Sequence, residues 1–234
     1  MRGSNRDLIK SWIDEGALGK LMKRLLSVIA VLVCVHIANA DENYITIDDF
    51  EKGLSPRWEA KEFKGRTRYS VIETKDGRAL KAESNAKASA LIYKYNYSLK
   101  EYPILTWRWK VENTLRKGDE TRKEGDDYAA RIYVIFPHWL PPLTKSINYI
   151  WANKLPKGQH VPNPFYSKAV MVAVESGDEN VGKWIPERRN VYEDYRSAFG
   201  EEPPQVGGIA IMTDTDNTGE SAVAYYDDIR IEKQ

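Results

Sequence analysis

The stretch ILTWRWKV, residues 104–111, decides the fold class, because its side chains alternate strictly between apolar and polar. Successive side chains of an extended strand point to opposite faces. One face of this segment therefore carries the apolar residues Leu105, Trp107, Trp109 and Val111. The stretch YAARIYVIF, residues 128–136, alternates in the same way. Both stretches predict half-buried β-strands with one face in a core.

The same two-residue period recurs along most of the chain. Further strands are expected at residues 44–47, 69–73, 79–83, 88–95, 147–151, 169–175, 206–213 and 222–231. The one helical pattern is NVYEDYRSAFG, residues 190–200, with Asn190 as the capping residue and Gly200 as the stop. About ten short strands and a late helix predict an all-β fold: a two-sheet antiparallel jelly-roll sandwich with one short helix late in the chain.

The N-terminal region has the features of an export signal. Residues 22–40 contain two basic residues, an apolar run from Leu25 to Ile37 and a cleavage motif, Ala38-Asn39-Ala40. The run is shorter than the roughly 20 residues that a membrane-spanning helix needs. We therefore expect residues 1–21 to precede the true start, 22–40 to be a signal peptide and 41–234 to be a single jelly-roll domain. The mature protein would be periplasmic or secreted, with no membrane span.

Charge excludes some partners. Residues 1–40 hold 6 of the 35 Lys and Arg and 3 of the 34 Asp and Glu, which leaves residues 41–234 with a net charge of −2 when histidines are neutral. A nucleic-acid-binding domain carries a basic patch and a high isoelectric point, which this balance does not favour. The single cysteine, Cys34, lies inside the expected signal, so the mature chain offers no thiol nucleophile.

The stretch AIMTDTDNTGES, residues 210–221, resembles the start of three different sites. A strand that ends in D-x-D-x-T is typical of haloacid-dehalogenase-type phosphatases, but these need a parallel α/β sheet, and only 16 residues follow Thr218. An EF-hand counted from Asp214 places Tyr225 where a bidentate Glu is required. The third alternative, a hairpin loop stabilised by its Asp and Asn side chains, is consistent with the sequence. Two carboxylates and an amide are nevertheless more than a turn requires.

Several longer motifs resemble one known family. They are WRWKV, GDDYAARIYVIF, NYIWANKLPKG, NPF, WIPERRNVYEDYRSAFGEEPP and IAIMTDTDNTGESAVAYYDDIRI. Together they are similar to the bacterial family called domain of unknown function 3047, over about residues 50–231. This resemblance implies an exported bacterial protein and assigns no activity.

A looser resemblance is to carbohydrate-binding jelly rolls. Their first strand carries a D-F-E-like element and their last strand a D-D-[IV]-x-[IV] element, matched here by residues 49–51 and 227–231. In such folds the terminal strands lie side by side and a structural calcium sits between them. The resemblance therefore implies a structural calcium at Asp49 and Asp228, and the Asp214 loop is a second place for one. No other cofactor is expected.

Strand alternation places Arg108, Arg131 and Tyr133 opposite the core. If their strands pair, these side chains share one sheet face, which is either an ordinary solvated surface or a recognition surface for acidic groups. Trp151 and Trp184 are either core residues or platforms on which a sugar ring stacks. The predicted function is binding of a polysaccharide or another cell-envelope ligand. The candidate ligand-binding residues are Arg108, Arg131, Tyr133, Trp151, Trp184, Arg188, Asp216 and Asn217.

An alternative is a glycan-cleaving hydrolase or lyase on the same scaffold that uses carboxylates on the same sheet face. Glycoside hydrolysis needs two carboxyl groups roughly 5–10 Å apart. The candidate catalytic residues are Glu187, Asp194 and Asp214. The stretch KWIPERRNVYED, residues 183–194, also fits a simpler arrangement of helix capping and ion pairs.

Overall fold

A computed structural model describes residues 43–234 of the chain. The predictions about the start, the signal peptide and its cleavage lie outside the described residues. Tyr44–Gln234 forms one compact unit. In the described part of the chain, no helix is both long enough and apolar enough to cross a membrane.

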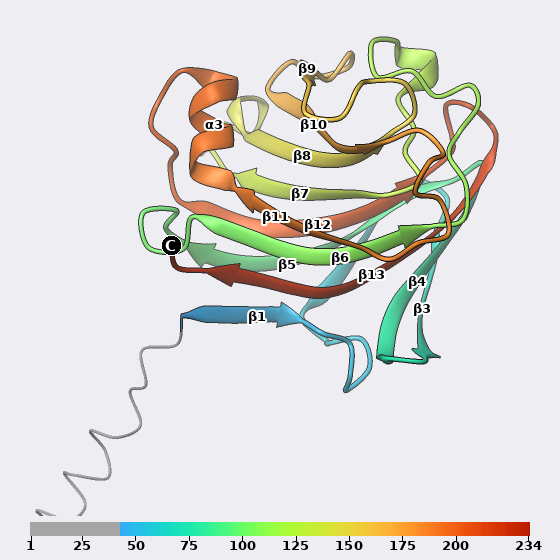
Figure 1. Cartoon of the computed structure of the whole chain (residues 1–234). Helices are drawn as coiled ribbons and strands as arrows, with labels where there is room; N and C mark the ends of the chain where they lie inside the picture. Colours follow the sequence, from blue (N-terminus) through green and yellow to red (C-terminus); the bar gives the residue numbers. More distant parts are fainter. Residues whose placement is uncertain (1–42) are drawn as a thin grey trace, which may run out of the picture. The chain divides into compact units, whose positions relative to one another are not determined.

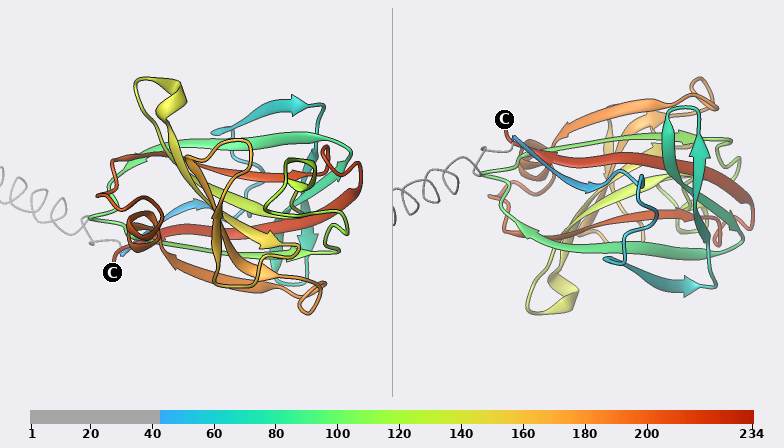
Figure 2. Two further views of the ribbon diagram at one scale, coloured as in Figure 1. Left: turned by 90° about the horizontal axis from the view of Figure 1, so that it is seen from above. Right: turned by 90° about the horizontal axis from the view of Figure 1, so that it is seen from below.

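Two sheets make up this unit, as predicted (Figure 1). The first has six strands, in the order β11 (Ile185–Asn190), β6 (Ile104–Val111), β13 (Ser221–Glu232), β4 (Gly77–Asn85) and β3 (Arg68–Thr74), while β1 (Tyr44–Asp48) pairs with the second half of β13. The second has seven strands, in the order β2 (Trp58–Lys64), β5 (Ala88–Tyr97), β12 (Val206–Asp214), β7 (Arg131–Phe136), β8 (Lys145–Ala152), β10 (Ala169–Ser176) and β9 (His160–Pro162). Viewed from above and below, the sheets lie face to face (Figure 2).

The core lies between the sheets and is rich in aromatic residues. Trp107 and Trp109 of β6 contact Tyr149 and Trp151 of β8, with ring centroids 5.3 Å and 5.9 Å apart. All four side chains are buried. Since an aromatic side chain buries 150–250 Å², each contributes at most roughly 4–6 kcal/mol at about 25 cal/mol per Å². The alternation in ILTWRWKV therefore correctly predicted which residues face the interior.

Among residues 43–234 the one α-helix, α3 (Val191–Phe199), lies at one end of the sandwich (Figure 1). It contacts β11 and β6 of one sheet and β8 of the other. The Asn190 side chain accepts a hydrogen bond from the Glu193 backbone N–H at 3.1 Å, and Gly200 ends the helix with a φ of +68°. The predicted cap and stop are both confirmed. Two 3₁₀ turns, Lys123–Gly125 and Pro141–Leu143, lie in loops.

The structure differs from the predicted strand pattern in three places. Strands β2, β9 and β11 were not expected, and β11 begins directly after Trp184 in a segment that we assigned to the helix entrance. The pairing of β10 with β8 is parallel, whereas every other pair is antiparallel. Residues 153–168, between these two strands, are long enough for the crossover that a parallel pair requires.

Candidate functional site

The two sheets separate residues that alternation alone placed on one surface. Arg108 lies on β6 of the six-stranded sheet, and Arg131 and Tyr133 lie on β7 of the seven-stranded sheet. Each points away from the core, as predicted. The prediction that Arg108 and Arg131 share one surface is wrong, because β6 and β7 belong to different sheets and their outer faces point in opposite directions.

A groove of about 630 Å³ crosses the outer face of the seven-stranded sheet. We call it the outer groove. Its apolar lining consists of Phe63, Ala88, Tyr133, Phe165, Ala169 and Met212. Its polar lining consists of Lys64, Asp126, Arg131, Asn148, Asn163, Asp214, Asp216 and Asn217. The groove therefore contains four of the predicted ligand-binding residues, Arg131, Tyr133, Asp216 and Asn217, and one predicted catalytic residue, Asp214.

Arg131 forms a buried ion pair in the floor of the outer groove. Its Nη2 donates to Asp214 Oδ2, and its guanidinium lies over the rings of Tyr128 and Tyr133, 4.8 Å and 5.4 Å from their centroids. Burial opposes the charge of Arg131, but the Asp214 carboxylate raises the pKa of the guanidinium above its usual value. Burial also raises the pKa of Asp214, and the carboxylates of Asp127 and Asp126 raise it further while Arg131 opposes the rise.

Two polar atoms of the floor lack hydrogen-bond partners within the part of the chain that the structure describes. They are Arg131 Nε and Asn148 Oδ1, and both residues are almost completely buried. Asn148 uses only its amide nitrogen, which donates to Met171 Sδ at 3.3 Å. Buried polar groups in folded proteins are nearly always hydrogen-bonded. Both atoms are buried within the floor, where the surrounding described residues do not satisfy them.

Exposed aromatic rings flank this floor. Phe63 lies on the edge strand β2 and is 57% exposed, and Phe165 lies in the loop before β10 and is 54% exposed. Strands β5, β12, β7 and β8 lie between β2 and β10 in the sheet order. The rings therefore belong to opposite sides of the groove. An exposed Phe on each side is a feature of a surface that contacts a partner with an apolar face.

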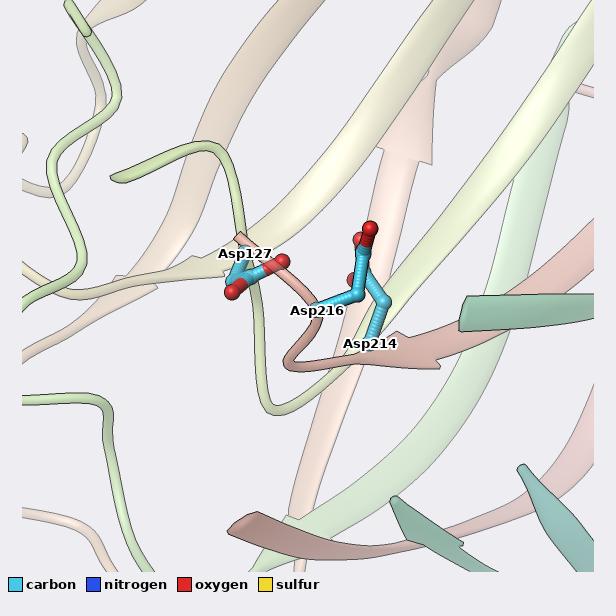
Figure 3. Close-up of side chains that lie close together, drawn as sticks. All are labelled: Asp127, Asp214 and Asp216. Carbon is cyan, nitrogen blue, oxygen red and sulfur yellow. The ribbon is translucent and has the colours of Figure 1, made fainter. Parts of the chain in front are cut away.

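Three carboxylates gather where β12 ends. One oxygen each from Asp127, Asp214 and Asp216 lies within 4.8 Å of the others (Figure 3). Asp214 and Asp216 line the outer groove, and Asp127 lies beneath them and is fully buried. The unusual polarity of the loop after β12 was visible in the sequence. Asp126 and Asp127, after Gly125, are typical of a turn that enters a strand, and the alternative interpretation of this stretch made one of them an acid/base or a metal ligand.

The predicted tryptophan platforms do not line the outer groove. Trp151 is fully buried, and its Nε1 donates to the Gly177 carbonyl at 3.0 Å, so the prediction that it stacks on a ligand is wrong. Trp184 is partly exposed on the outer face of the six-stranded sheet, where Arg108 lies 5.0 Å from its ring centroid. Arg188 is exposed on β11 and lies 3.6 Å from Glu232.

Arg108 is held by two acidic residues of β13. Its guanidinium donates to Asp227 Oδ2 through Nε at 3.0 Å and through Nη2 at 2.5 Å, and Asp228 Oδ2 lies 3.2 Å from Nε. A bulge in β13 between Asp227 and Arg230 brings both carboxylates to one guanidinium, and Asp228 has a φ of +52° there. The pairs stabilise the bulge of β13, and they lie on the sheet opposite to the outer groove.

The candidate catalytic carboxylates lie in separate environments. Asp194 is on α3, where it forms an ion pair with Arg189 and accepts a hydrogen bond from Tyr149 at 2.7 Å. Glu187 is on β11 of the six-stranded sheet. Asp214 lies in the outer groove. The prediction that these three residues share a sheet face is therefore wrong, and the geometry does not support carbohydrate cleavage by them.

The calcium implied between the terminal strands has no visible cluster of ligands. Strands β1 and β13 do pair, as the looser resemblance implied. Asp49 Oδ1 accepts the Glu51 backbone N–H at 3.2 Å, and Asp228 is bound by Arg108 and Arg230. Within residues 43–234, only Asp127, Asp214 and Asp216 form a group of three or more acidic, His or Cys side chains with metal-ligand spacing.

Sequence reasoning missed several residues of the outer groove. Phe63 lies in WEAKEFK, an edge strand without clear alternation, and Phe165 and Asn163 lie in the loop motif NPF. Asn163 donates to both carboxylate oxygens of Asp126 at 2.8 Å and accepts from the Phe165 backbone N–H at 2.9 Å, so it fixes the position of Phe165. The signal that was available is the polar Asn148 inside an otherwise apolar strand.

Comparisons with known proteins give structural neighbours and a family. No curated protein matches the chain. Solved structures with a similar arrangement include a carbohydrate-binding module specific for non-crystalline cellulose, CBM28 (16% identity, TM-score 0.42, covering 80% of this chain and 93% of that one). They also include the Emp47p carbohydrate recognition domain (12%, 0.45, 83% and 96%) and the module TmCBM61 in complex with β-1,4-galactotriose (11%, 0.42, 82% and 99%).

The family assignment comes from the sequence itself. Residues 56–230 match the family described as Protein of unknown function (DUF3047), which confirms the resemblance that the motifs indicated. The chain belongs to this family.

Proposed function

We propose that the protein binds a neutral polysaccharide segment in the outer groove and does not cleave it. The observation that carries this proposal is the pairing of two exposed rings, Phe63 and Phe165, with a groove lining that also contains uncharged polar side chains, among them Asn217. Sugars have both apolar C–H faces and hydroxyl groups that donate and accept hydrogen bonds. A groove with both kinds of contact fits such a ligand.

The size of the groove supports this ligand class. Its volume of about 630 Å³ falls within the roughly 300–1,000 Å³ that is typical of ligand sites. The small side chains of Ala88 and Ala169 leave room above the floor between the aromatic rings. A short oligosaccharide fits a space of this size better than a single small ion or a folded protein partner.

The charge of the groove favours a ligand without acidic groups. Its lining includes two basic residues, Lys64 and Arg131, and three acidic ones, Asp126, Asp214 and Asp216. Arg131 is already paired with Asp214, so its charge is not free to bind a ligand carboxylate. This pairing argues against the earlier expectation that the arginine recognises acidic groups.

Binding experiments with matched variants test the proposal. We expect the whole chain to bind at least one neutral oligosaccharide from cell-wall or exopolysaccharide fragments in isothermal titration calorimetry. Phe63→Ala and Phe165→Ala should each weaken binding about fivefold, because loss of an aromatic contact costs about 1 kcal/mol. Trp139→Ala is the control, because Trp139 is 82% exposed and lies outside the groove. Absence of saturable binding across the fragments, or an equal effect of Trp139→Ala, would contradict the proposal.

A further inference from the structure

The cluster of Asp127, Asp214 and Asp216 is held in place by the loop that follows β12. The Thr215 backbone N–H donates to the Lys87 carbonyl at 2.9 Å, and the Gly219 N–H donates to the Thr215 carbonyl at 2.9 Å. The Thr215 hydroxyl also bonds with Ser84 at 2.8 Å. These contacts fix the loop from both sides. The carboxylates are therefore kept together although their like charges repel each other.

Asp127 points to a ligand independently of this clustering. It is completely buried, its Oδ2 accepts the Thr218 backbone N–H at 2.6 Å, and its Oδ1 has no partner among the residues that the structure describes. The side chain faces Asp214 and Asp216 (Figure 3). A buried carboxylate oxygen that lacks a donor is costly unless a cation or another donor satisfies it.

Neighbouring basic groups do not balance the cluster. Arg131 pairs with Asp214. Lys64 Nζ lies 3.9 Å from Asp216 Oδ2 and donates instead to the Asp216 backbone carbonyl at 2.9 Å, and its side chain is 63% exposed. Asp127 has no basic partner among the ion pairs of the described chain.

We propose that Asp127, Asp214 and Asp216 bind one calcium ion at the end of the outer groove. Carboxylate oxygens select hard cations such as calcium and magnesium over zinc or copper. The three candidate ligand oxygens lie within 4.8 Å of one another, close enough for one ion to contact all three at calcium–oxygen distances of about 2.3–2.6 Å. Magnesium needs shorter bonds of about 2.0–2.1 Å and nearly ideal octahedral geometry, and it usually keeps several of its waters, so a cluster of protein carboxylates favours calcium.

Calcium titration of the whole chain tests this site without any sugar ligand, so its outcome is separate from that of the proposed glycan binding. After treatment with a chelator, the protein should bind one calcium ion per chain in isothermal titration calorimetry and bind magnesium more weakly. Calcium should also raise the melting temperature, because the folded state alone presents the three carboxylates together.

Substitutions locate the ion. Asp127→Asn and Asp216→Asn should each weaken calcium binding at least about tenfold, since even outer-shell changes at metal sites cost 10–100-fold. Asp216 is partly exposed, so its variant should keep the far-ultraviolet circular dichroism of the wild type even if Asp127→Asn unfolds. Asp49→Asn removes the same charge at the terminal strands and should leave binding within about twofold.

Four results would overturn the assignment. The first is a lack of saturation by about 5 mM calcium, a concentration above the dissociation constants of weak extracellular calcium modules. The second is magnesium binding as tight as calcium binding. The third is an unchanged calcium affinity in Asp216→Asn, and the fourth is loss of calcium binding in Asp49→Asn.

Discussion

Glu187 is a half-buried carboxyl group on β11. Its Oε1 has no hydrogen-bond partner in the described chain. Burial raises the pKa of Glu187 to about 7, and the Glu175 carboxylate contributes to the rise while Lys157 opposes it. Glu175 itself is bound by Lys157 and by Asn180. The folded protein therefore favours the protonated form of Glu187 at pH values below about 7.

This pKa predicts a pH-dependent stability. The folded pKa lies above the unfolded value of about 4.5, so the contribution of Glu187 is fully present below pH 4.5 and is lost as the pH rises through 7. Glu187→Gln keeps a neutral side chain at every pH. Its free energy of unfolding, relative to the wild type, should therefore rise between pH 5 and pH 8 by on the order of 2 kcal/mol. Urea denaturation at both pH values measures this difference, with the exposed Glu179→Gln as control. A constant difference would contradict the predicted titration.

The strands that sequence analysis missed are informative about sheet edges. Strands β2 and β11 each end a sheet, so each pairs along one side only. In β2 only Trp58 is buried, and the other residues are charged or exposed. In β11, Pro186 is tolerated because an edge strand can leave one backbone position without a hydrogen bond. Neither β2 nor β11 has a continuous buried face, so the clear alternation that identified the central strands is absent from both.

The cap of α3 can be tested as an element. Asn190→Ala removes the acceptor for the Glu193 N–H and should lower stability by about 1 kcal/mol, equivalent to about 2–4 °C in melting temperature for a domain of this size. Asn190→Asp keeps an acceptor and places a negative charge at the positive end of the helix, so it should retain the wild-type stability. Thermal unfolding measures both. If the two variants lose the same stability, the side-chain cap contributes nothing and backbone packing alone positions the helix.

At the scale of the whole molecule, alternation predicts the orientation of a side chain but not its sheet. Arg108 and Arg131 were both correctly placed opposite the core. The sheet to which each arginine belongs is set by pairing between strands that are distant in sequence: β6 pairs with β13, and β7 pairs with β12. Likewise, the outer groove combines residues as far apart as Phe63 and Asn217. The number of sheets, the one helix of the described residues and the sidedness of most strands follow from local patterns, whereas the site depends on long-range pairing that no local pattern encodes.

The proposed ligand class implies that the protein meets polysaccharide outside the cytoplasm, and we propose that residues 22–40 direct its export. When the whole chain is expressed in a Gram-negative host, the mature protein should be recovered from the periplasm or the medium with Asp41 as its first residue. Ala40→Leu should block this cleavage, because signal processing requires small residues in the A-x-A motif. Ala30→Leu, within the apolar run, should be processed normally. Mass spectrometry of the fractionated protein separates these outcomes. A cytoplasmic product that still carries residues 22–40 would contradict the export proposal and leave the groove without access to an envelope polysaccharide.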